Sequence, residues 1–197
     1  MDISGKSAGA TGVVAWQALL VGPALPELGP GPRAGVRPVA VLEAACAAAV
    51  TACSLAGERA QLARGAVLLW HDHHDEAHGI AQEIASREGS WLHGMLHRRE
   101  PDFSNAAYWY QRVGQHAAFA GLARRVALVA EEAGDGELKR ALIRGASWSA
   151  RGFIDACEAC AGRADAEPRR QLLQRIQAIE FEVFLEHVVQ GGEGAGR

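Results

Sequence analysis

Apolar residues recur at helical spacing along most of the chain after Pro38. Positions 42, 45, 49 and 52 carry leucine or alanine and predict a helix over 39–55, with Gly57 as its stop. A second and longer stripe predicts one helix over 62–86. Its members are Leu62, Ala66, Leu69, His73, Ala77, Ile80 and Ile84.

Breaks and caps divide the rest of the chain into further helices. Gly89-Ser90 interrupts the long pattern, and Ser90 is placed to cap a short helix that ends before Pro101. Asp102 or Ser104 is expected to cap the next helix, which runs to about Val113. Three more helices are predicted over 122–133, over 138–162 and from Pro168 onward, with a turn at 134–136. Because no alternating strand pattern competes, we predict an all-α fold, a single bundle-like domain of six to eight helices.

The first forty residues have a different composition. Gly22 to Pro38 holds five of the seven prolines, interspersed with glycines, and predicts irregular backbone, because proline fixes φ and has no amide donor. We therefore expect an irregular N-terminal arm over 1–38, a helical domain over 39–190 and a disordered tail over 191–197. Trp16 and Leu19 to Val21 are expected to pin the arm onto the helical body.

Composition restricts the classes of function. Of 197 residues, 49% are hydrophobic and 22% are charged, which is enough apolar material for a real core. The formal charge of −3 gives no electrostatic footprint for nucleic acid. The N-terminus has no signal-peptide pattern, and Val39 to Ala56 carries Glu43 and resembles a buried helix more than a membrane span. We expect a cytoplasmic protein without nucleic-acid or membrane partners, and a homo-oligomer is compatible with the sequence.

The candidate chemistry is concentrated in the middle of the chain. Seven of the eight histidines fall between His71 and His116. His93 and His97 are four residues apart, so both imidazoles face the same way on a helix and can bind one ion, and His74 and His78 offer the same pairing. With a carboxylate from Glu76 or Asp72, such a set would suit zinc, iron or manganese.

Two other interpretations of these histidines remain open. They can form a buried structural network with carboxylates, since buried polar groups are hydrogen-bonded. They can also form a metal-free acid–base site. The metalloprotease signature His-Glu-x-x-His is absent from the sequence.

Arginines near the histidines suggest binding of a polar or anionic molecule. Arg98, Arg99 and Arg112 carry planar donor groups suited to carboxylate or phosphate, and Asn105 and Tyr108 follow closely. The alternative is that Arg98 and Arg99 pair with Glu100, Asp102 or carboxylates of the predicted helix over 62–86 and tie the two segments together. The lone pair Cys157 and Cys160 predicts reduced, inert helix thiols, because a structural zinc site needs a second pair of cysteines.

The region from about Leu68 to Phe119 resembles an uncharacterised family of helical proteins. The first shared segment is D-H-x-D-E-[A/S]-H-x-I-A-Q, which is here Asp72, His73, Asp75, Glu76, Ala77, His78, Ile80, Ala81 and Gln82. The second is H-x-x-x-H-R-R-E, here His93, His97, Arg98, Arg99 and Glu100, followed by Pro101, Asp102, Asn105, Tyr108 and Trp109. The resemblance implies a helical fold with a His/Glu/Arg cluster at its centre, and it favours His78 as the partner of His93 and His97. It implies no activity.

The sequence thus predicts a small-molecule enzyme or binder with a pocket that contains a divalent transition metal or acid–base groups. The expected metal ligands are His78, His93, His97 and Glu76, and the expected catalytic groups are Glu76, His78 and His97. Arg98, Arg99, Asn105 and Tyr108 are expected to bind a small polar or anionic substrate. The competing hypothesis is a non-enzymatic structural or interaction protein, in which the same residues form a satisfied polar core.

Overall fold

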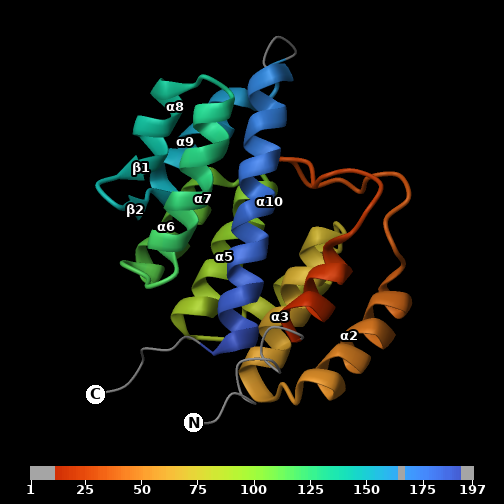
Figure 1. Ribbon diagram of the computed structural model, residues 1–197. Coiled ribbons are helices and arrows are strands. Elements are labelled where there is room, and N and C mark those ends of the chain that lie inside the picture. The colour runs from red at the N-terminus through yellow and green to blue at the C-terminus, as the bar shows by residue number, and fades with distance from the viewer. Residues whose placement is uncertain (1–11, 164–166, 192–197) are drawn as a thin grey trace.

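The computed structural model describes residues 12–163 and 167–191, and it confirms the all-α prediction (Figure 1). About 71% of the chain is helical, and the sheet consists of two very short strands. Residues 12–17 are helical and lead into the first element for which bounds are given. The elements are η1 (Ala18–Leu20), α2 (Val39–Cys53), α3 (Gly57–Trp70), α4 (His74–Ala81), α5 (Arg87–Arg99), α6 (Phe103–Val113), α7 (Phe119–Glu132), α8 (Gly136–Leu142), β1 (Ile143–Arg144), β2 (Ser147–Trp148), α9 (Ala150–Cys160) and α10 (Glu167–Gln190).

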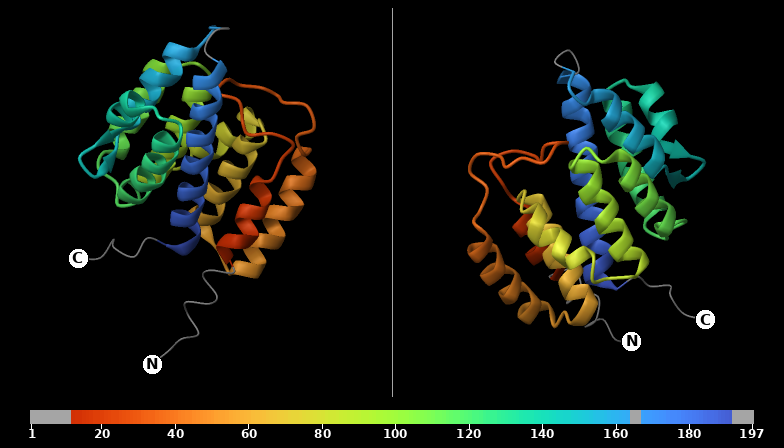
Figure 2. Two further views of the ribbon diagram at one scale, coloured as in Figure 1. Left: turned by 45° about the horizontal axis from the view of Figure 1, so that its top comes forward. Right: turned by 180° about the vertical axis from the view of Figure 1, so that it is seen from behind.

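The long helix α10 lies between two groups of helices. In Figure 1 it runs between a group made of α6 to α9 with the hairpin and a second group made of α2, α3 and the N-terminal arm. The view from behind in Figure 2 shows the same division. Side chains of α10 are buried on several faces, including Leu173, Ile176, Phe181 and Phe184. This all-round burial makes α10 the core helix against which both groups pack.

The predicted helix over 62–86 is wrong, because the chain breaks it at His71 to His73. Helix α3 ends at Trp70, and Asp72 adopts a left-handed conformation with φ of 65°. The amide of His73 bonds the carbonyl of Leu68 at 3.0 Å and that of Asp72 bonds Leu69 at 3.1 Å, which is a Schellman cap. The sequence hides this cap, since the left-handed residue is aspartate where glycine is usual. Because of this break, α4 does not continue the axis of α3, and its side chains do not follow the stripe of the predicted helix.

The cap of α5 is Ser86 and not the predicted Ser90. The Ser86 hydroxyl accepts a hydrogen bond from the amide of Gly89 at 3.1 Å, so the helix begins at Arg87 and includes Gly89 and Ser90. Gly89 is needed inside the helix because a Cβ there would lie 2.2 Å from the carbonyl oxygen of Ile84. The predicted cap at Asp102 is confirmed, since its carboxylate accepts from the amide of Asn105 at 3.2 Å.

The predicted helix over 138–162 is also wrong. The chain forms α8, then the β1–β2 hairpin, then α9, with Ile143 paired to Trp148 and Arg144 to Ser147. Gly145 turns the hairpin with φ of 64°, a conformation that glycine adopts without strain. These two breaks are the reason why the described part of the chain has more helices than the six to eight expected.

The arm expected to be irregular over 1–38 is instead helical at 12–20, and it is irregular over 21–38. The expected pinning residues Trp16, Leu19 and Leu20 are buried, whereas Val21 is exposed. Of the expected tail, only Gly191 belongs to the described residues. Helix α2 buries one face, through Leu42, Cys46 and Ala49, and lies at the edge of the molecule in Figure 1. Across the described ranges, no helix combines the length and apolar character that crossing a bilayer requires.

Candidate functional site

Three of the predicted histidines meet where α4 faces α5. His93 and His97 lie one turn apart on α5 with ring centroids 5.0 Å apart, and His78 of α4 packs edge-on against both, at 4.9 Å and 5.6 Å. One ring nitrogen from each residue lies within 4.8 Å of the other two. We call these three residues the histidine triad. The i,i+4 spacing on α5 and the short connection from α4 bring them together.

His93 is poor in protons. Burial, together with repulsion from the neighbouring His97 and His78, lowers its pKa to about 4. The indole of Trp109, on α6, stacks on the His93 ring at 3.9 Å with an angle of 9° between the planes. A neutral imidazole held in a fixed plane offers a lone pair to a metal ion or to a proton donor.

His97 is oriented by two neighbours. Its Nδ1 lies 2.8 Å from Oε2 of Glu100, and its Nε2 lies 3.2 Å from the amide nitrogen of Asn105. With Nδ1–H donating to the carboxylate, Nε2 carries the lone pair, and this lone pair accepts the hydrogen bond from the side-chain amide of Asn105. Asn105, predicted to bind substrate, therefore does lie at the triad.

Two other predicted site residues lie at the surface. Glu76 is exposed on α4 and is not part of the triad, because residues two apart on a helix point about 200° apart and His78 occupies the inner side. Tyr108 is exposed on α6, packed edge-on against Trp109. Arg112, one turn further along α6, lies over the Trp109 ring at 5.4 Å from its centroid.

The guanidinium of Arg98 is bound to partners inside the core. Its side chain is fully buried, and Nη2 lies 2.7 Å from Oε2 of Glu180 on α10. Nη1 donates to the hydroxyl of Tyr110 at 2.9 Å, and the guanidinium lies 4.4 Å from the centre of the Phe153 ring. Tyr110 in turn donates to Glu180. This geometry corresponds to the alternative in which arginine pairs with a carboxylate, although Glu180 is not among the carboxylates expected.

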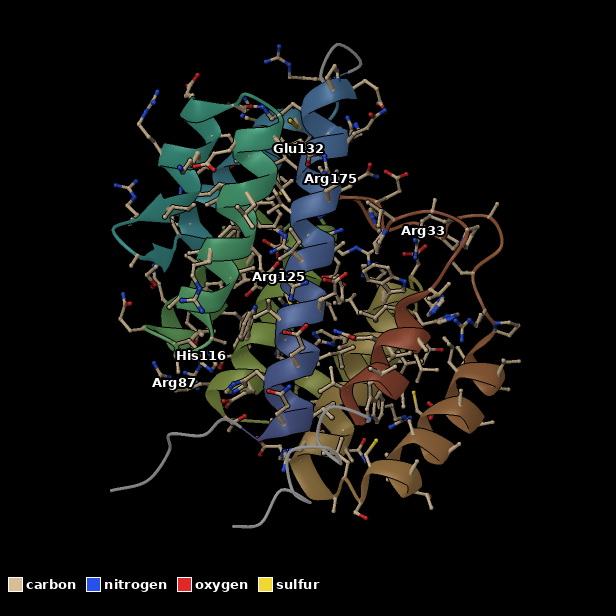
Figure 3. All side chains as sticks on the ribbon, in the orientation of Figure 1. Arg33, Arg87, His116, Arg125, Glu132 and Arg175 are labelled. Atoms are coloured by element: carbon tan, nitrogen blue, oxygen red, sulfur yellow. The ribbon has the colours of Figure 1, made fainter. Side chains whose placement is uncertain are left out.

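The guanidinium of Arg99 is also bound to buried partners. Its Nη2 lies 2.6 Å from Oδ1 of Asp72, and both side chains are inaccessible to solvent. The other carboxylate oxygen of Asp72 accepts from the backbone amide and Nε of Arg33, at 2.7 Å and 2.9 Å. Arg99 also donates to the carbonyl of Glu27 at 3.1 Å. Figure 3 shows Arg33 on the arm, directed toward the helical body.

His71 and His73 hold the same arm. Nε2 of His71 lies 2.8 Å from the carbonyl oxygen of Leu19, and Nε2 of His73 lies 2.8 Å from that of Arg37. The segment at the end of α3 is thus a docking platform for residues 19–37. His71 and His74 do not join the triad, and the pairing of His74 with His78 is not seen.

A second cluster was missed by the sequence analysis. Oε1 of Glu88 lies 3.2 Å from Nε2 of His116 and 3.0 Å from Nε2 of His187, although these residues belong to α5, the α6–α7 connection and α10. Figure 3 shows His116 beside Arg87, which donates to the carbonyls of Val113 and Gln115. The histidine hydrogen bonds hold the pKa of Glu88 well below its usual range. His187 gave no signal in the sequence, because its partner lies 99 residues away.

The tautomer of His116 argues against a metal in this second cluster. Its Nδ1 accepts a hydrogen bond from the amide of Ala118 at 3.2 Å, so Nε2 carries the proton and donates to Glu88. A metal at Nε2 would move that proton to Nδ1 and set it against the Ala118 N–H. The cluster is therefore a hydrogen-bonded contact that joins three segments.

The four cysteines are free thiols. Burial raises the pKa of Cys157 to about 12 and that of Cys46 to about 11. Thiols with such pKa values hold little thiolate at neutral pH and are poor nucleophiles.

No family model, no curated protein and no solved structure matches this chain.

Proposed function

We propose that the histidine triad binds one divalent transition-metal ion and uses it to bind or activate a small polar or anionic molecule. The observation that carries the proposal is the convergence of three imidazole nitrogens within 4.8 Å, with no carboxylate among them. Three imidazoles favour zinc or iron over manganese, which prefers oxygen ligands. Around a zinc ion, neighbouring nitrogens stand about 3.3 Å apart, so small side-chain rotations complete the site.

The neighbours of the triad support this role. Glu100 fixes the tautomer of His97, as the carboxylate partners of metal-binding histidines do. Three protein ligands leave a fourth position open, and an ion there would supply Lewis-acid chemistry or an activated water for hydrolysis.

Helix α6 supplies the groups that would orient a substrate. Asn105, Trp109 and Arg112 lie on one face of this helix, and the first two contact the triad. The cation of Arg112 favours an anionic molecule. Arg98 and Arg99 are left out of this role, because both are paired with buried carboxylates. We also propose a cytoplasmic location, which the four free thiols support.

Metal analysis of the full chain tests the proposal. Protein purified without an affinity tag and without chelator is expected to contain close to one zinc or iron per chain by elemental mass spectrometry. The double variant His93→Ala, His97→Ala should lose the metal while its circular dichroism remains helical. The matched control is His116→Ala, His187→Ala, which removes two histidines from the second cluster and should keep the metal.

One observation favours a non-enzymatic, structural role instead. Both nitrogens of His97 already have hydrogen-bond partners, in Glu100 and Asn105. In that case wild-type protein contains no metal, and His93→Ala lowers the melting temperature because the rings of His97 and Trp109 lose the imidazole stacked between them and a cavity is left. Loss of metal from the control variant alone would place the ion at the second cluster and refute the triad.

A further inference from the structure

A cavity of about 480 Å³ opens between α6, α7, the β-hairpin and α9. This volume lies in the range of small-molecule sites, about 300–1,000 Å³. Its apolar surface comes from three aromatic side chains and three aliphatic ones. They are Tyr110, Phe119 and Trp148, with Ala107, Ala150 and Ile154.

The charge of the lining is entirely positive. Arg144 and Arg151 are its only ionisable groups apart from the tyrosine. Arg151 already bonds Asp155 on its own helix at 2.7 Å. Arg144 is exposed, and its guanidinium has no hydrogen bond or ion pair with any residue that the structure describes. A free guanidinium beside an apolar cavity attracts an anion, because nothing in the wall neutralises it.

Polar groups in the wall add hydrogen-bonding capacity. The indole Nε1 of Trp148 is buried and has no acceptor among the described residues, although Trp148 is only 4% exposed. A buried donor without a partner is costly, and a small movement of the wall that brings Nε1 to an acceptor on a bound molecule would relieve that cost. Ser147, Gln111 and Gln115 also line the cavity.

We infer that this cavity binds a small amphipathic organic anion, such as an aromatic carboxylate or sulfonate. The hydrophobic body lies against Phe119, Trp148 and Ile154, and the anionic group pairs with Arg144. The β-hairpin, which replaces the predicted helix at this point, supplies Arg144, Ser147 and Trp148 to the wall.

This site is separate from the proposed metal site. None of the three histidines lines the cavity, which touches the other side of α6 through Ala107, Tyr110 and Gln111. Binding here therefore does not depend on the metal, and the two proposals fail or stand independently.

Fluorescence titration of the full chain tests the inference with two probes. 8-Anilinonaphthalene-1-sulfonate is an aromatic anion of suitable size, and N-phenyl-1-naphthylamine is the same molecule without the sulfonate. We expect saturable binding of the anion at one site and weaker binding of the neutral probe. Arg144→Gln should weaken the anion about tenfold, the value of one charge-assisted hydrogen bond, and leave the neutral probe unchanged.

Control variants separate the cavity from other sources of binding. Arg140→Gln removes an exposed arginine of α8 that does not line the cavity and should change neither probe. Ala107→Leu narrows the cavity and should weaken both. The double variant His93→Ala, His97→Ala should bind both as the wild type does.

Absence of saturable binding overturns the inference. The inference is also overturned if Arg144→Gln and Ala107→Leu bind the anionic probe as tightly as the wild type. The same holds if Arg140→Gln weakens the anionic probe as much as Arg144→Gln does, because that would indicate a general effect of charge. Circular dichroism of each variant confirms that the probe reports on folded protein.

Discussion

The guanidinium of Arg99 and the carboxylate of Asp72 form an ion pair of 2.6 Å that is closed to solvent. Burial opposes ionisation of Asp72, but hydrogen bonds from Arg33 and Arg99 outweigh it and lower the pKa of the carboxyl. The pair joins the end of α5 to the break between α3 and α4, and through Arg33 it fixes the N-terminal arm. It thereby sets the position of α4, which carries His78.

Substitution of Asp72 is therefore expected to destabilise the whole fold. Asp72→Asn leaves two buried arginines without a counter-charge and should cost about 3 kcal/mol of unfolding free energy. The control Asp75→Asn changes an exposed aspartate three residues away and should stay within about 0.5 kcal/mol. Urea unfolding measures both, and equal stability of the two variants would contradict the role given to Asp72.

Two tyrosines of α6 make a second matched test. Tyr110 is buried, and its hydroxyl bonds both Arg98 and Glu180, whereas Tyr108 is exposed. Tyr110→Phe should lower the unfolding free energy by about 1–3 kcal/mol, since it leaves two charged groups short of a partner. Tyr108→Phe should change it by less than about 0.5 kcal/mol. A larger loss in Tyr108→Phe would show that the burial of these side chains has been assigned wrongly.

The pairing of His93 with His97 could be anticipated from local geometry, whereas His78 was assigned to them by the resemblance to the helical family. Two of the residues are one helical turn apart, and the third lies on the preceding helix. The stripe drawn along one continuous helix over 62–86 failed for His73, because α3 ends at Trp70 and Asp72 is left-handed. An aspartate in that conformation is uncommon, and no glycine marked the break.

The partner of Arg98 could not be found in the same way. Glu180 lies 82 residues beyond Arg98, so only the packing of α10 against α5 brings them together. The one available signal was an acidic residue between Ile179 and Phe181, and Glu182 stands in the same apolar run. Glu88 and His187 had no such signal, since an acidic residue near the start of an exposed helix and a histidine near the end of one are both common.

Acid should destabilise the protein through His74. Burial lowers the pKa of His74 to about 4, and the positive charge of Arg99 adds to this effect. In the unfolded chain a histidine has a pKa of about 6.5. Between about pH 4 and pH 6.5 the unfolded state therefore binds a proton that the folded state does not bind. Stability is thus complete above about pH 6.5 and falls as the pH drops toward about 4.

The variant His74→Gln isolates this contribution. Between pH 7 and pH 4 the unfolding free energy of the wild type should fall by about 1–3 kcal/mol more than that of the variant. The upper value corresponds to the full difference between the folded and unfolded pKa of His74. Thermal or urea unfolding at both pH values provides the comparison. If wild type and variant lose the same amount, another group is responsible for acid sensitivity.

Glu100 should tune the affinity of the proposed metal site. Glu100→Gln keeps the side-chain shape but removes the charge that fixes the His97 tautomer, and we expect a 10–100-fold weaker affinity for zinc. Competition with a chromophoric chelator measures this affinity. Glu83→Gln, which changes an exposed glutamate after α4, is the control and should leave it unchanged. Equal affinities for zinc in both variants would remove Glu100 from the site.

Two glycines of the arm allow a test of how closely it approaches Asp72. Gly31 has φ of 80°, and a Cβ there would lie 2.8 Å from the Asp72 carboxyl, whereas a Cβ at Gly29 would meet nothing within 4 Å. Gly31→Ala is expected to lower the unfolding free energy by about 1–3 kcal/mol, from backbone strain and from displacement of the carboxylate. Gly29→Ala should be close to neutral. Hydrogen exchange of the Arg33 amide, which donates to Asp72, should accelerate in Gly31→Ala alone. Unchanged exchange at Arg33 would mean that the arm is held by its other contacts and not by this one.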